Sequence, residues 1–251
     1  MGTPPLKHDL VAEYDAGDVT VRHPRGERDT ARAAVDVVRA LWPVVEAYLG
    51  APWQGRLRVD LLAEARASGA NPAAATLRHS VRGVQQRSPA TAGILSYQLG
   101  QVLWYAATNE AEYRGPTPRA PDWLLTAALT PLTHAWSERD TWTDHLARHV
   151  QRAVRRAPLP EAALAQHAAL APSTLALAVS QSLARGRSLQ QRQPGWVRSL
   201  RARLAEEPQW DAWRALEAVT GADPETWQAR FEADLVAWRS DDDEWRPGVV
   251  T

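Results

Sequence analysis

The chain of 251 residues contains no cysteine, a single methionine, a single phenylalanine and a single lysine. The absence of cysteine excludes disulfide bonds, thiolate metal ligands and cysteine nucleophiles. No run approaches the roughly 18 apolar residues that a membrane-spanning helix needs, so we expect no membrane partner. The first residues, MGTPPLKHDLVAEYDAGD, lack a basic segment followed by an apolar core. We therefore expect no signal peptide and a cytoplasmic location.

Charge is balanced overall but segregated along the chain. Residues 148–205 hold ten arginines and one acidic residue, whereas residues 206–251 hold twelve acidic residues and four arginines. One interpretation is that two helical layers neutralise each other within one fold. The other is a surface that binds nucleic acid or another polyanion. That surface would use the arginines Arg185, Arg187, Arg192, Arg198, Arg201 and Arg203.

The N-terminal third predicts a mixture of helix and strand. Apolar spacing predicts a helix from Asp29 to about Leu49, which Gly50 ends. Residues 56–62 alternate between apolar and polar side chains, which is typical of a strand with one buried face. Residues 67–75 predict a loop, and the arginine-containing segment 76–84 predicts an edge strand.

The remainder predicts helices almost throughout. Beyond the helix that opens at Pro89, the expected helices cover residues 122–136, 138–157, 172–185, 195–206, 208–220 and 224–239. Gly221 should end one helix, and Asp223 should cap the next, with Pro224 at its first position. The expected fold class is α+β, a small N-terminal sheet packed on helices and then an all-helical part. The expected division is 1–90, 91–240 and an acidic tail at 241–251.

Three segments, in this order, carry a resemblance to a known family. They are GILSYQLGQVLWYA (93–106), PDWLLTAAL (121–129) and WRALEAVTGADPETWQARFEADLVAW (213–238). Order and spacing resemble the gluzincin metallopeptidases, in particular the peptidase MA-like group. The resemblance implies a zincin-like fold in which an HExxH helix and a glutamate from the following helix hold zinc.

The resemblance implies that this chain lacks every functional group of that site. The three ligand positions correspond to Tyr97, Gln101 and Thr126, and the general-base position corresponds to Gln98. A neutral phenol, an amide and a hydroxyl suit zinc poorly, and glutamine cannot accept a proton from water. We therefore expect no catalytic residues, no metal and no cofactor. The expected function is that of a pseudo-peptidase binding a protein or peptide in a cleft lined by Tyr97, Gln98, Gln101, Trp123 and Thr126.

Other interpretations stay open beside this one. The helix at 93–106 could be an ordinary amphipathic helix of an unrelated α-rich protein. His145 and His149 have the spacing of metal ligands, with Asp144 beside them, but no third ligand is evident, so a polar helix face is favoured. No nucleophile motif or phosphate-binding loop is present. A hydrolase would need catalytic residues of an unrecognised kind.

Overall fold

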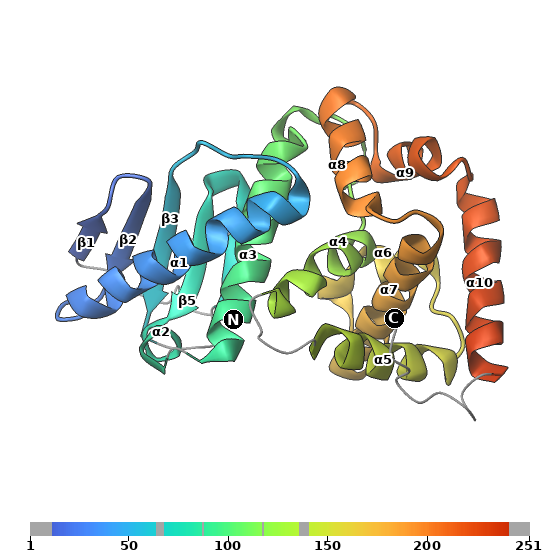
Figure 1. Ribbon diagram of the computed structural model, residues 1–251, viewed down its shortest axis with the longest axis horizontal. Helices are drawn as coiled ribbons and strands as arrows, with labels where there is room; N and C mark the ends of the chain where they lie inside the picture. Colours follow the sequence, from blue (N-terminus) through green and yellow to red (C-terminus); the bar gives the residue numbers. More distant parts are fainter. Residues whose placement is uncertain (1–11, 64–67, 87, 117, 136–140, 241–251) are drawn as a thin grey trace, which may run out of the picture. The chain divides into compact units, whose positions relative to one another are not determined.

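The computed structural model describes residues 12–63, 68–86, 88–116, 118–135 and 141–240, and its fold is α+β (Figure 1). The predicted acidic tail at 241–251 lies outside these residues. The described residues fall into two compact units, divided between Ala106 and Ala107. The helix that opens at Pro89 therefore groups with the sheet rather than with the helical part of the chain. In the part of the chain that the structure describes, no helix has the length and apolar character to cross a membrane.

In the described residues, the N-terminal unit is a five-stranded sheet with three α-helices and a short 3-10 helix, η2 (Pro72–Ala74). Its elements are β1 (Ala12–Asp15), β2 (Val19–His23), α1 (Arg28–Leu49), β3 (Leu57–Leu62), β4 (Gly69–Asn71), β5 (Thr76–Ser80), α2 (Val81–Gln86) and α3 (Pro89–Ala107). The strand order is β1-β2-β3-β5-β4. The central strands β2, β3 and β5 run parallel, and β1 and β4 pair antiparallel at the two edges.

Alternation and capping explain the elements that the sequence predicted here. Leu57, Val59 and Leu61 of β3 are buried, which confirms the predicted strand. The prediction of a single buried face was wrong, because Asp60 and Leu62 on the other face are buried as well. Helix α1 ends where Gly50 adopts the left-handed conformation, at φ 67°, as predicted. Three other predictions were wrong. The strand predicted over 76–84 ends at Ser80, where α2 begins. The predicted loop at 67–75 contains the edge strand β4, and β5 is therefore an inner strand, paired with β3 and β4.

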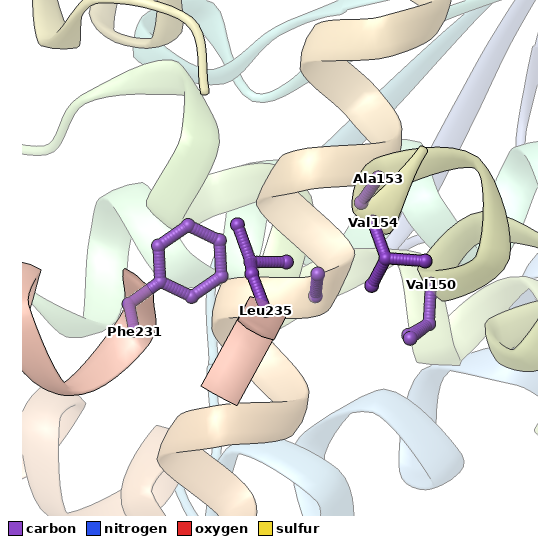
Figure 2. Packing of buried hydrophobic residues seen from close by; sticks show 6 residues of the cluster. Val150, Ala153, Val154, Phe231 and Leu235 are labelled. Carbon is purple, nitrogen blue, oxygen red and sulfur yellow. The ribbon is translucent and has the colours of Figure 1, made fainter. Parts of the chain in front are cut away.

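The C-terminal unit is helical. Its elements are η3 (Glu110–Glu112), α4 (Asp122–Leu129), η4 (Thr130–His134), α5 (Thr141–Val154), α6 (Glu161–Ala165), η5 (His167–Ala169), α7 (Pro172–Arg192), α8 (Trp196–Glu206), α9 (Ala212–Thr220) and α10 (Pro224–Ser240). Helix α7 contacts α4, α5, α6 and α10 and so forms the centre of this unit. Figure 2 shows Phe231 and Leu235 of α10 on one side of the cluster and Val150, Ala153 and Val154 of α5 on the other.

Helix α7 is central although its sequence is polar. Ser180 and Ser182 are fully buried, and each hydroxyl donates to the backbone carbonyl four residues earlier. Small side chains also let α4 approach closely, because a Cβ at Gly186 would lie 3.0 Å from the Cβ of Ala127. The helix is therefore held by close backbone approach and by hydrogen-bonded serines, in addition to the buried Leu183 and Leu189.

Arg119 ties together the segments around the end of α8. Its side chain is 1% exposed and donates to the backbone carbonyls of Thr108, Leu204, Glu207 and Trp210. The carbonyls at the end of a helix have no partner within the helix, so this guanidinium satisfies groups that would otherwise be buried without hydrogen bonds.

Replacing Arg119 by alanine should destabilise the protein by roughly 3 kcal/mol or more, because buried carbonyl groups lose their donors. Urea unfolding followed by circular dichroism measures this change. The control is Arg203→Ala, which removes an ion pair with Glu206 on the surface and should cost less than about 1 kcal/mol. Equal losses in the two variants would contradict the role given to Arg119.

Candidate functional site

The residues at the predicted zinc-helix positions offer no metal ligand set. Tyr97 and Gln101 are half buried and lie one helical turn apart on α3. Gln98 is buried; its Nε2 donates to the backbone carbonyl of Arg78 in β5 over 3.3 Å, and its Oε1 has no hydrogen-bond partner. The amide at the predicted general-base position thus points at the sheet. None of these side chains carries a charge or an imidazole, so the donor set does not fit zinc.

Trp123 and Thr126 of α4 belong to the C-terminal unit. Trp123 is completely buried, and its indole Nε1 donates to Oε1 of Glu161 over 2.9 Å. Thr126 is buried, with its hydroxyl oxygen 3.4 Å from Nδ1 of His167. Since Tyr97 belongs to the other unit, the arrangement of these residues around one cleft stays a prediction.

Arg185 is the buried centre of a polar network that reaches the surface. Its side chain is 2% exposed. The prediction that Arg185 belongs to an exposed arginine surface was therefore wrong. The guanidinium lies 4.9 Å from the ring centre of Trp123 and 5.1 Å from that of Phe231. Its Nη1 donates to Oε2 of Glu161 over 2.7 Å, and its Nη2 donates to Oε1 of Gln228 over 2.8 Å.

The network continues from Arg185 to the surface. Because the carbonyl oxygen of Gln228 accepts from Arg185, its amide nitrogen points the other way and donates to Oε1 of Glu232 over 2.7 Å. Glu161 accepts from Trp123 with one oxygen and from Arg185 with the other. The donors therefore point from the interior toward the surface, where the chain of hydrogen bonds ends on the carboxylates of Glu161 and Glu232.

A pocket of about 800 Å³ opens over this network. One wall is the first turns of α10, and the opposite wall is the segment that leads into α6. Trp213 of α9 closes part of it, in contact with Trp123 at 5.5 Å between ring centres. The lining residues are Pro158, Leu159, Pro160, Glu161, Arg185, Trp213, Pro224, Glu225, Gln228, Ala229 and Glu232.

The start of α10 gives this wall its position. Gly221 ends α9 in the left-handed conformation, and the carboxylate of Asp223 accepts from the backbone nitrogen of Thr226 over 2.7 Å, which confirms the predicted boundary. The helix then begins at Pro224 and presents Glu225 and Glu232 two turns apart.

A second, smaller hollow of about 220 Å³ lies beside the pocket. Glu161 and Trp213 line both, and Asp211 adds a further carboxylate to the smaller one. The two hollows together present four carboxylates on largely apolar walls, with both arginines of the lining, Arg119 and Arg185, buried behind them.

The remaining predicted arginines have partners or packing of their own. Arg192 pairs with Asp234 at 2.5 Å, and Arg203 with Glu206 at 3.0 Å. The guanidinium of Arg187 lies 4.6 Å from the ring centre of Trp238. Arg198 is exposed, and Arg201 is half buried. The pair between Arg192 and Asp234 joins the basic block of the sequence to the acidic block, as the charge-neutralising interpretation expects.

Three histidines pack with tilted rings beside Trp142, His134 from η4 and the other two, His145 and His149, from α5. The ring centres of His134 and His145 are 4.8 Å apart, and those of His145 and His149 are 4.5 Å apart. Nδ1 of His149 lies 2.9 Å from the hydroxyl of Ser180 in α7. Burial, with neighbouring His145 and arginines, lowers the pKa of His149 to about 4. Across the described residues, no three His, Cys, Asp or Glu side chains are grouped to hold a metal ion.

Sequence reasoning missed the residues of this pocket. Glu161 stood out only as the one acidic residue of the basic block, and Gln228 and Glu232 fell within a predicted helix. The one available signal was Arg185 itself, because a basic residue among buried helical positions needs acceptors nearby. No protein-family model matches the chain, and no curated protein sequence matches it.

Acid should destabilise the helical unit through His149. A histidine whose pKa falls from 6.5 to about 4 on folding binds its proton more weakly in the folded state. Its contribution to stability is therefore complete above about pH 6.5 and is lost as the pH falls toward 4. The urea midpoint should fall across this range and should fall less in His149→Gln, which keeps a polar partner for Ser180. An identical pH dependence in both proteins would contradict this assignment.

Proposed function

We propose that this protein is a non-catalytic binding module that takes a peptide or a protein segment into the pocket of its C-terminal unit. The observation that carries this proposal is the pocket itself, about 800 Å³ with proline, leucine and tryptophan walls over a buried polar network. Mostly apolar concave sites with a few fixed polar groups are typical of ligand binding. Arg185, Glu161 and Gln228 are held in place by one another, so the polar groups are ordered before any ligand arrives.

The proposal includes descent from the zinc peptidases without their chemistry. The segments that carry the gluzincin resemblance lie on α3, α4, α9 and α10, in that order along the chain. The four positions of the zinc site carry Tyr97, Gln98, Gln101 and Thr126, which neither bind zinc well nor activate water. These residues support a pseudo-peptidase whose retained role is binding. The polyanion alternative has less support, because Arg185 is buried and Arg192 and Arg203 are paired with carboxylates.

Filling the pocket should remove binding. Ala229 is an exposed residue of α10 that lines the pocket, so Ala229→Trp should occupy it with little effect on folding. Retention of a degenerate dodecapeptide pool by the immobilised full chain should fall roughly tenfold. The control is Ala218→Trp, at an exposed position of α9 outside the pocket. Equal retention by the wild type and Ala229→Trp would overturn the pocket as the binding site.

The proposed descent has its own test. The variant Tyr97→His, Gln98→Glu, Gln101→His, Thr126→Glu restores the family's ligands and base, and it should bind zinc more tightly than a variant that keeps Thr126. The physical reason is the third ligand, which only the first variant has. Calorimetric titration with zinc, on variants shown by circular dichroism to be folded, measures the difference. Equal affinities would contradict a zincin-like site.

A further inference from the structure

The exposed polar side chains of the pocket are mainly hydrogen-bond acceptors, the carboxylates of Glu161, Glu225 and Glu232. Two of the donors of Arg185 are used by Glu161 and Gln228, and its Nε is buried without a hydrogen-bond partner. The amide nitrogen of Gln228 is used by Glu232. Among the side chains that line the pocket, the donors outside this network are the indole of Trp213, the second amide hydrogen of Gln228 and the remaining N–H groups of Arg185, whose side chain is 2% exposed. A ligand that fits must therefore supply donors of its own.

The charge of the pocket is negative. Glu161, Glu225 and Glu232 line it, against the single positive charge of Arg185, which lies buried behind Glu161. A low-dielectric apolar wall strengthens the attraction between these carboxylates and a cation. Trp213 adds an aromatic face on which a guanidinium can stack.

From this complementarity we propose that the pocket selects a basic peptide segment, with arginine or lysine side chains paired to Glu225 and Glu232. This inference rests on the proposed function, since it names the class of ligand for the same pocket. Glu225 and Glu232 lie two helical turns apart, about 10 Å along the axis, so one cationic side chain does not pair with both. In an extended polyproline-type segment, side chains three positions apart face the same side at a spacing of about 9 Å. Two basic residues separated by two others match the two carboxylates.

The experiment compares two degenerate dodecapeptide pools on the immobilised full chain. One pool has arginine fixed at two positions separated by two variable residues, and the other has citrulline at both. Citrulline keeps the shape and most donors of arginine but has no charge. The arginine pool should be retained roughly three- to tenfold better, and the advantage should shrink as salt is raised from about 0.05 M to about 0.5 M.

Two double variants locate the charge. Glu225→Gln with Glu232→Gln should bring the ratio of arginine to citrulline retention near one, with the helix content unchanged. The control is Glu206→Gln with Glu217→Gln, which removes the same charge from exposed positions outside the pocket and should leave the ratio as in the wild type. An unchanged ratio in the first double variant would overturn the proposal.

The outcomes separate this inference from the proposed function. If both pools are retained equally by the wild type and both are lost in Ala229→Trp, the pocket binds peptides without selecting charge. That result overturns the inference and leaves the proposed function standing. If neither pool is retained by the wild type, the proposed function fails, and the inference fails with it.

Discussion

The buried guanidinium of Arg185 is the constraint on which the helical unit and its pocket depend. A charge at 2% exposure is tolerated only when acceptors surround it. Glu161 supplies the neutralising charge, and Gln228 supplies a second acceptor whose orientation then determines where its own nitrogen points. The rings of Trp123 and Phe231 pack against the guanidinium, with their centres 4.9 Å and 5.1 Å from it. One buried charge thereby sets the positions of side chains on α4, α6, α7 and α10.

Arg119 meets the same requirement in a different way. Its acceptors are backbone carbonyls rather than a carboxylate. Arg119 therefore holds backbone segments together, whereas Arg185 positions charged side chains at the pocket. Helix α9 joins the same arrangement, because the backbone nitrogen of Ala212 donates to the carbonyl of Arg119 over 2.8 Å. This places Trp213, the next residue, at the edge of the pocket. The hydrogen bond that fixes the start of α9 is therefore directly next to a residue that lines the pocket.

Elements marked by a local sequence pattern could be predicted from the sequence. Features that depend on contacts between residues far apart in the sequence could not. The alternation of β3 and the cap at Asp223 each follow from residues next to one another. Helix α7 was predicted too short, and its arginines were assigned to a surface, because arginines spaced three to four residues apart also describe an exposed helix face. Only contacts with Glu161 and Gln228, far away in sequence, show that Arg185 is interior. The resemblance assigned Gln98 to the general-base position, an assignment that stays a prediction, and it did not predict the hydrogen bond of Gln98 to β5.

The sharing of Glu161 and Trp213 between two adjoining hollows has a consequence for how ligands would interact with one another. A molecule in the smaller hollow changes the hydration and charge of the same carboxylate that a molecule in the larger one meets. The two binding free energies are then coupled, and thermodynamic reciprocity makes the coupling equal in both directions. A positively charged molecule in one hollow neutralises Glu161 and so weakens the attraction of the other hollow for cations. Cations in the two hollows therefore bind with negative cooperativity.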